Sequence, residues 1–414
     1  MVTEPIETRL ARAGLPPLGR TAWLEIDLDA LRGNLLAMRE AAGPGVLVEP
    51  VVKADAYGHG AIEVARTLEV AGADGLSVAT LDEALQLRAA GVSLPLLVLY
   101  PIPPEQVAAA AAARVATAIG PGLLGERILA AAAAAAGDGA AEPLEVHVEV
   151  ETGLGRGGAL PDEAAALIEV ASRAPGVRLG GTWTHLAAAD DAGYSRGQDA
   201  RFGSALEPLV DAVEWGSGAG AVRRHLAGSG GVLAGDVDRW DAVRTGISIY
   251  GLMPDGLTAA ASTAGAASRL RPVMSLKARP VRVIDLPPGH GVSYGPVFFT
   301  ARTSRIATLP LGYADGWRRV LTAHADALVR GVRVPLVGRV AMDAVMADVT
   351  DVPGPPVTED DEFVLLGEQG DLRITAHDLA SAAGTISYEI VTGMSGRLAR
   401  VYHAAGSVVG VRTP

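Results

Sequence analysis

The amino-acid sequence predicts a parallel (β/α)8 barrel followed by a second, mainly β domain. Its 414 residues exceed what one ordinary hydrophobic core accommodates, so two domains are expected. From residue 46 onward, short β-rich runs alternate with longer stretches in which apolar residues recur at helical spacing. Past about residue 265, closely spaced strands with Gly and Pro turns replace this alternation.

Eight β-rich runs support the barrel. They lie at 46–53, 75–79, 95–100, 114–119, 144–150, 178–186, 223–229 and 242–251. Helical candidates between them include 60–72, 81–91 and 161–174. Such alternation, repeated about eight times, is typical of a parallel α/β barrel, and a doubly wound open sheet is the alternative that the pattern leaves open. The Ala-rich stretch 107–136 fits as a helix, a short strand and a second helix.

The domain boundary is expected near residue 265, where the alternation of strands and helices gives way to closely spaced strands. We expect a barrel domain over 1–265, with an N-terminal extension whose additional strand, at 23–28, is free to dock elsewhere. The β domain covers 266–414 and contains a late helix at 375–384. The stretch of small residues at 257–268 indicates the linker between the two domains.

Composition excludes several function classes. A formal charge of -12 and a pI near 5.2 argue against nucleic acid as a partner. The absence of cysteine removes disulfides, thiolate nucleophiles and Cys-ligated zinc, and no metal site is expected. The N-terminus lacks the apolar core of a signal peptide, and no apolar stretch is long enough to span a bilayer. We therefore expect a cytoplasmic protein that does not bind membranes.

Reactive side chains fall where a barrel places its catalytic groups, at the carboxyl ends of strands. Lys53 ends the first run, His185 and Ser229 lie at the ends of the sixth and seventh, and Arg156 follows the fifth. A lysine that closes an apolar strand loses hydration there. Burial lowers its pKa and makes it nucleophilic toward an aldehyde. A lysine that extends to the rim is the alternative that this feature alone leaves open.

The segment VVKADAYGHG, at 51–60, resembles the cofactor-lysine motif of alanine racemases. Further segments match that family in the same order: TGLGR (152–156), THLAAAD (184–190), VRTGISIYG (243–251), VSYG (292–295), LGYADGW (311–317), GRVAMD (338–343) and SYEI (387–390). The resemblance extends from about Trp23 to Tyr402. It implies a barrel with a C-terminal β domain, pyridoxal 5′-phosphate as cofactor, and a head-to-tail homodimer with shared active sites.

The resemblance also implies which residues bind the cofactor. Lys53 forms the Schiff base and is one of two bases, and Arg244 faces the pyridine nitrogen. His185 links Arg244 to the second base, although a lone strand histidine is more often a core residue. The phosphate is held by Tyr57, Ser229, the backbone amides of Gly246 and Ile247, and Tyr388. Alternatively, Tyr57 is an aromatic residue that only packs on the rim of the barrel. Gly246 is alternatively a glycine that only allows a turn.

Substrate contacts are implied in both domains. Tyr294, donated by the partner subunit, resembles the second base, and its phenol requires nearby cations to titrate below its ordinary pKa near 10. Arg156 holds the substrate carboxylate and the cofactor's phenolic oxygen. Met342 and Tyr313 of the partner close a small pocket. Alternatively, Met342 only packs in the hydrophobic core, and Tyr313 is a structural aromatic residue in a turn.

Two positions depart from the family pattern. Glu149 stands where many members carry a carbamylated lysine, and Gly228 stands where many carry asparagine. Along this strand His147, Glu149 and Glu151 alternate with valines, so the three should share one face. We expect Glu149 to orient Arg156 without carbon dioxide, whereas a merely wet polar face is the alternative.

The resemblance implies interconversion of L-alanine and D-alanine, an amino-acid substrate and a supply of D-alanine for cell-wall precursors. One alternative is the same chemistry on serine or another amino acid. A second alternative is a non-catalytic cofactor-binding protein. Such proteins are barrel-only, so the β domain with Tyr294 and Met342 counts against it.

Overall fold

The computed structural model describes residues 4–137 and 142–414, and it divides into two compact units. The barrel unit comprises 31–56 and 61–271. The β unit comprises the residues through Ala30, the segment 57–60, and 272–414. The N-terminal segment, grouped with the barrel domain in the sequence analysis, thus lies in the β unit.

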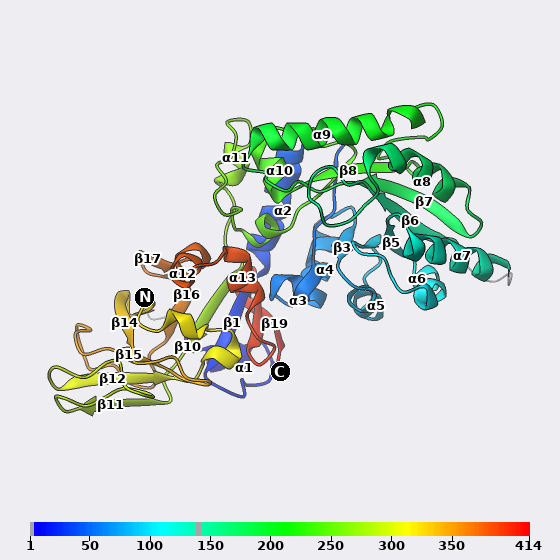
Figure 1. The fold of residues 1–414 in the computed structure, drawn as a ribbon. Coiled ribbons are helices and arrows are strands. Elements are labelled where there is room, and N and C mark those ends of the chain that lie inside the picture. The colour runs from blue at the N-terminus through cyan, green and yellow to red at the C-terminus, as the bar shows by residue number, and fades with distance from the viewer. Residues whose placement is uncertain (1–3, 138–141) are drawn as a thin grey trace. The chain divides into compact units, whose positions relative to one another are not determined.

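A single eight-stranded parallel sheet forms the barrel unit (Figure 1). In the order in which they pair, its strands are β2 (Leu47–Val48), β9 (Ala242–Arg244), β8 (Arg223–Gly228), β7 (Val177–Trp183), β6 (Leu144–Glu149), β5 (Val115–Ile119), β4 (Leu96–Val98) and β3 (Leu76–Val78). A parallel bridge between Val51 and Ser77 joins the first strand of this order to the last. Each predicted run contains one strand, so the barrel prediction is confirmed.

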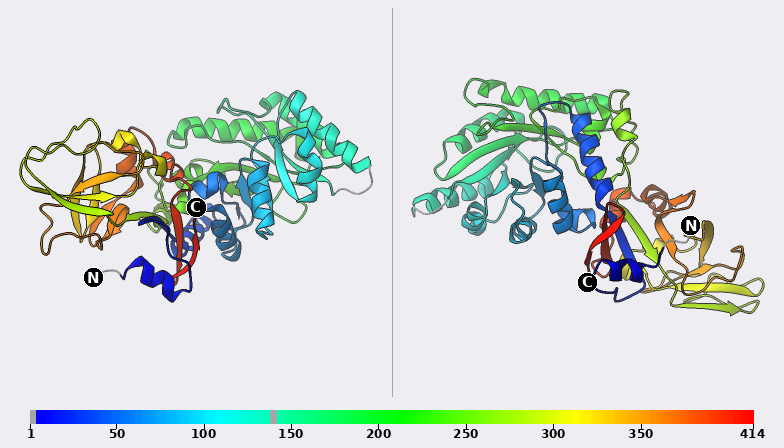
Figure 2. Two further views of the ribbon diagram at one scale, coloured as in Figure 1. Left: turned by 90° about the horizontal axis from the view of Figure 1, so that it is seen from below. Right: turned by 180° about the vertical axis from the view of Figure 1, so that it is seen from behind.

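In the chain, the helices of the barrel unit lie between its strands, apart from the last one, α11, which follows the last strand (Figures 1 and 2). They are α4 (Ala61–Val70), α5 (Leu81–Ala89), α6 (Val107–Ala112), α7 (Leu123–Gly137), α8 (Pro161–Arg173), α9 (Ala192–Leu206), α10 (Ser229–Ala234) and α11 (Ala264–Ala267). Helices α5, α6, α7, α8 and α10 contact the sheet. Two more, α2 (Leu28–Ala42) and α3 (Lys53–Tyr57), begin in one unit and end in the other. The Ala-rich stretch forms α6, β5 and α7, as predicted. In the described ranges, no helix has the length and apolar character needed to cross a bilayer.

A mostly antiparallel sheet forms the β unit. Its path is β11 (Arg282–Leu286), β12 (Ser304–Leu309), β15 (Val345–Asp348), β14 (Val332–Val337), β13 (Asp326–Val329), β16 (Phe363–Gln369), β10 (Met274–Ala278), β1 (Ala22–Asp27), β18 (Ala399–Ala404) and β19 (Ser407–Arg412), with β17 (Leu372–Ile374) beside β16. Helices α1 (Ile6–Arg12), α12 (Ala376–Ala383) and α13 (Ser387–Thr392) belong to this unit.

Strand β1 is central to the β sheet because it pairs on both sides. It runs antiparallel to β10 and parallel to β18. Trp23, Leu24 and Ile26 are fully buried, and Trp23 packs in a core cluster that includes Ile6 and Leu10 of α1. The additional N-terminal strand expected from the sequence therefore docks in the middle of the β unit.

Candidate active site

Polar side chains gather at the carboxyl ends of the barrel strands, where barrels place catalytic groups. Arg244 ends β9, Ser229 directly follows β8, and His185 lies two residues beyond β7. Arg156 lies in the loop after β6. Lys53 begins α3 rather than ending a strand, since β2 stops at Val48 and the chain continues through single bridges. All five belong to the barrel unit.

Lys53 is followed by a turn of left-handed backbone. Residues Ala54 through Tyr57 have φ values of 52° to 55°, a region that costs a residue with a side chain about 1–2 kcal/mol. Glu83 holds the turn, because its carboxylate accepts hydrogen bonds from the Ala54 nitrogen at 2.6 Å and the Ala79 nitrogen at 2.8 Å. Strained backbone that is held in place by other contacts is typical of functional sites. Here the hydrogen bonds of Glu83 fix the backbone next to Lys53.

The electrostatic surroundings of Lys53 favour its neutral form. Burial lowers the pKa of Lys53, and the charges of Arg156 and Arg244 lower it further, while Glu83 opposes them. The neutral amine is the nucleophilic form of lysine. By contrast Nζ of Lys277, in the β unit, lies 3.1 Å from Glu25 and 2.9 Å from Glu362. Of these two lysines, Lys53 is therefore the one whose surroundings favour the neutral, nucleophilic amine.

Ser229 organises a cluster of backbone N–H groups at the start of α10. Its hydroxyl oxygen accepts from the nitrogens of Gly246 at 2.9 Å and Ser248 at 3.2 Å. Because the oxygen accepts twice, the hydroxyl hydrogen remains to donate. Ile247 is fully buried between these two residues. Backbone N–H groups and a hydroxyl donor in a turn after the last strands suit a phosphate.

Arg244 is a rigidly held buried cation. Its guanidinium donates to the carbonyl oxygens of Thr184 at 2.7 Å and His225 at 3.0 Å, and lies over the Trp183 ring at 4.6 Å. Burial lowers the pKa of Arg244 to about 10, which leaves it charged at neutral pH. Nδ1 of His185 lies 3.4 Å from Arg244, and burial with that nearby charge lowers the pKa of His185 to about 3. His185 is therefore a neutral partner of Arg244.

Glu149 and Arg156 form an ion pair with a nitrogen–oxygen distance of 3.7 Å. The guanidinium of Arg156 also lies over the ring of Tyr100, 5.7 Å from its centroid. Burial raises the pKa of Glu149, whereas Arg156 lowers it. His147 is fully buried and Glu149 is 8% exposed, so this face of β6 is not solvated, contrary to the wet-face alternative.

A second group of predicted site residues meets in the β unit. Tyr294, Tyr313 and Met342 line an open hollow of about 490 Å³, with Arg319 and Arg339 at its sides. The three are 76%, 43% and 52% exposed, which is unusual for large apolar side chains that lie together. The backbone nitrogen of Tyr313 donates to the Ala341 carbonyl at 3.1 Å, which joins the two loops.

Tyr57 and Tyr388 form an aromatic pair in the β unit, with ring centroids 6.3 Å apart. Burial raises the pKa of Tyr57, and the neighbouring Tyr388 raises it further, so this phenol stays protonated and able to donate. Gly58 follows closely, and a Cβ there would lie 2.3 Å from the Val391 oxygen. The segment 57–60 is thereby fixed against α13.

Four residues around the site were not singled out by the sequence analysis: Tyr100, Glu83, Trp183 and His225. Tyr100 ends a predicted strand run, so the strand-end rule could have identified it. Glu83 lies three residues after Thr80 and completes a capping box, which gave a local signal of a helix start. Trp183 and His225 lie within strands, where nothing local distinguishes a site residue from core.

His147 and His225, which are buried and hydrogen-bonded in a chain to Arg244, should make the stability of the protein sensitive to acid. Burial lowers the pKa values of His147 and His225, so the native state stays unprotonated where the unfolded state binds two protons, below about pH 6.5. These two histidines make stability rise with pH, by up to about 3 kcal/mol per pH unit, until it levels off above about pH 6.5. His185 and His403, whose pKa values are also lowered, add to the slope. Urea unfolding between pH 5 and 8 measures this slope. His147→Asn should flatten it by about 1.4 kcal/mol per pH unit, and an unchanged slope would contradict the interpretation.

Two family models cover most of the chain. The model described as alanine racemase, N-terminal domain, matches residues 26–254, and the model described as alanine racemase, C-terminal domain, matches residues 273–402. Curated relatives include the alanine racemase of Desulfovibrio desulfuricans, 41% identical over 92% of this chain and 98% of the relative. The alanine racemase of Symbiobacterium thermophilum is also 41% identical, over 92% of this chain and 97% of the relative.

Solved structures give the same result. The alanine racemase of Clostridium difficile has a TM-score of 0.85 at 31% identity, covering 96% of this chain and 99% of that one. That of Bacillus anthracis, with bound L-Ala-P, has a TM-score of 0.83 at 34% identity, with the same coverage. Both matches include the barrel and the β unit.

Proposed function

This chain belongs to the alanine racemase family, and from that premise we propose that it interconverts L-alanine and D-alanine with pyridoxal 5′-phosphate bound covalently to Lys53. The difference between the chain's two lysines carries the assignment. Lys53 is partly buried beside two guanidinium groups, which lower its pKa, whereas Lys277 is paired with two carboxylates. An aldehyde cofactor requires the first kind of lysine.

The other polar groups of the barrel unit fit the same cofactor. We assign the phosphate to the Ser229 hydroxyl and the amides of Gly246 and Ile247; the Gly246 amide donates to the Ser229 oxygen in this structure and would turn to the phosphate when it binds. In the β unit, Tyr388 and the protonated Tyr57 are further donors. Arg244 donates and never accepts, which suits an unprotonated ring nitrogen. When bound, the cofactor withdraws electrons from the substrate's α-carbon and so acidifies the α-proton. By keeping that nitrogen unprotonated, Arg244 would limit the withdrawal and so favour return of the proton over transamination.

Inversion at the α-carbon requires a base on each face. We assign one face to Lys53 and the other to Tyr294, while Arg156 holds the substrate carboxylate and Glu149 orients Arg156. Neutral His185 connects Arg244 with the tyrosine base. Met342 and Tyr313 restrict the pocket to a small side chain, which favours alanine over larger amino acids.

The exposure of Tyr294 supports a homodimer with shared sites. Tyr294 is 76% exposed and lines an open hollow with Tyr313 and Met342, so another surface is needed to enclose a substrate against its phenol. We propose that the β domain, expected from the sequence at 266–414, covers the barrel site of a second copy. The proposed setting is the cytoplasm, where the enzyme supplies D-alanine for cell-wall precursors.

The test is formation of D-amino acids from a panel of L-amino acids by purified protein with added cofactor. We expect D-alanine to form fastest. Faster turnover of serine or a basic amino acid would replace the proposed substrate, and cofactor binding without any racemisation would favour a non-catalytic role.

Glu149 gives a prediction specific to this chain. Its carboxylate is permanent, so activity should not change when bicarbonate is removed. Glu149→Gln weakens a charge-assisted contact to Arg156, which holds the substrate carboxylate, so KM for alanine should rise more than kcat falls. Steady-state kinetics in both directions measure the effect. Unchanged kinetics would show that another group orients Arg156.

A further inference from the structure

A chain of buried hydrogen bonds runs through the barrel interior behind Arg244. Glu145 and His147 lie on β6, and His225 lies on β8; we name these three side chains the barrel relay. Oε1 of Glu145 lies 3.2 Å from Nε2 of His147. Nδ1 of His147 lies 2.8 Å from Nε2 of His225, and Nδ1 of His225 contacts Nη1 of Arg244. Both histidines are fully buried, so no water competes for these nitrogens.

The direction of these hydrogen bonds follows from the two ends of the relay. A guanidinium only donates, so Nδ1 of His225 accepts from Arg244, and a neutral His225 then carries its hydrogen on Nε2. That hydrogen is donated to Nδ1 of His147, which therefore carries its own hydrogen on Nε2. At the other end a carboxylate only accepts, so Glu145 independently requires a hydrogen on Nε2 of His147. The two ends impose the same direction.

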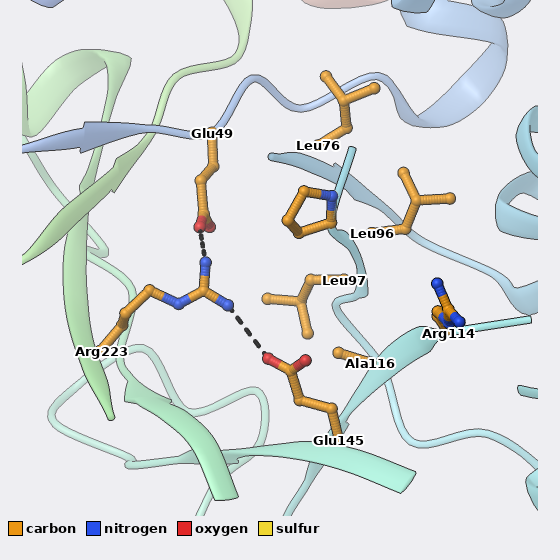
Figure 3. Close-up of a pocket in the computed structure, with 9 residues that line it drawn as sticks. Glu49, Leu76, Leu96, Leu97, Arg114, Ala116, Glu145 and Arg223 are labelled. Atoms are coloured by element: carbon orange, nitrogen blue, oxygen red, sulfur yellow. Dashed lines mark hydrogen bonds and ion pairs between the residues drawn. The ribbon is translucent and has the colours of Figure 1, made fainter. Parts of the chain in front are cut away.

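Glu145 is built to remain a carboxylate. Burial opposes its charge, but the hydrogen bond from His147 and the charges of Arg178 and Arg223 lower the pKa of Glu145. Nη2 of Arg223 lies 3.1 Å from Oε1, and Arg178 contacts Oε2. Figure 3 shows Arg223 between Glu145 and Glu49, with which it forms a second ion pair. The cavity beside this group, about 20 Å³, holds at most a water molecule.

We propose that Glu145 is a positioning residue, which fixes the hydrogens of His147 and His225 so that a neutral acceptor always faces Arg244. The alternative tautomer of His225 would direct an N–H at a guanidinium that also donates, and a protonated His225 would repel it. Either change would displace Arg244. The catalytic consequence rests on the proposed function, in which Arg244 faces the cofactor's ring nitrogen.

Spectroscopy of the protein without cofactor tests the relay directly. Long-range 1H–15N correlation with 15N-histidine reports which nitrogen carries the hydrogen, and His→Asn variants assign the signals. We expect His147 and His225 to be neutral and protonated at Nε2. In Glu145→Leu, which removes the acceptor, only Arg244 still imposes the direction, so His147 should also populate the Nδ1–H form, and His225 should do so wherever Arg244 is displaced. Glu145→Gln keeps an acceptor oxygen opposite Arg223, and the matched control Glu49→Gln lies outside the relay, so both should keep the Nε2–H form.

Kinetics with cofactor then separate positioning from a general structural role. Displacing Arg244 should lower kcat of Glu145→Leu by about ten- to a hundredfold with little change in KM. Glu145→Gln and Glu49→Gln should retain kcat. His147→Leu interrupts the relay while leaving the ion pairs of Glu145 in place, so it provides a second variant should Glu145→Leu fail to fold, and it should alter the tautomer of His225.

Three results would overturn the proposal. The first is an unchanged tautomer of His147 and His225 in Glu145→Leu, or of His225 in His147→Leu. The second is an equal loss of kcat in Glu145→Gln and Glu145→Leu, which would assign the effect to charge rather than to the acceptor. The third is an altered tautomer without any loss of kcat. An altered tautomer in a protein that never racemises alanine would instead refute the proposed function and support the tautomer assignment.

Discussion

Racemisation should be lost in both directions when Lys53 is replaced by alanine. The variant lacks the covalent attachment of the cofactor and the base on one face, and loss of a general base alone costs about 10²–10⁴-fold. The turn at 54–57 does not depend on the lysine side chain, so the variant should fold. D-alanine and L-alanine formation, measured separately, check the expected loss.

Chemical labelling provides the matched measurement. The chain contains only two lysines, so borohydride reduction of the cofactor-loaded protein must label Lys53 or Lys277. We expect the label in the VVKADAYGHG peptide and none in Lys53→Ala. A label on Lys277, or none in a loaded sample, would contradict the assignment.

Tyr294→Phe should suppress proton abstraction from L-alanine, by about a hundredfold or more. The hydroxyl is the only part of Tyr294 that the substitution removes, and the side chain is exposed, so folding should be unaffected. Solvent deuterium incorporation from each enantiomer measures abstraction on each face. Near-normal racemisation of both enantiomers would show that Tyr294 is not the second base.

Mixing the two inactive proteins tests whether the site is shared. In a mixed dimer of Lys53→Ala and Tyr294→Phe, one of the two sites retains both bases. Activity should therefore return as subunits exchange. Demonstrated exchange without returning activity would refute the shared site.

Local pattern predicted the barrel because each of its strands is a short apolar run between helical segments. It could not predict the pairing of β1, since the partners of that strand lie far away in the sequence. Local pattern also missed the left-handed turn, because no glycine occurs among Ala54 to Tyr57. Contacts such as the hydrogen bond to Glu83 stabilise this strained conformation.

The candidate site was predictable to a similar extent. Strand ends identified Lys53, Arg156, His185 and Ser229, whereas the residues of the β unit came only from family resemblance. Alternation along β6 placed His147 and Glu149 on one face. The partner of His147, His225, could not be inferred, because a histidine inside a strand gives no sign of what it contacts across a barrel.

The central position of β1 has a consequence for synthesis of the chain on the ribosome. About 250 residues separate Asp27, at the end of β1, from Met274, where β10 begins. At a synthesis rate of about 5–20 residues per second, β10 is made roughly 10–50 s after β1, and β18 is made later still. During that time the apolar side chains of β1, Trp23, Leu24 and Ile26, have no partner strand. Most of the barrel unit emerges in this interval and can fold first. The nascent chain therefore carries an unpaired apolar strand ahead of the barrel unit, so we expect chaperones that bind ribosome-attached chains to bind it there.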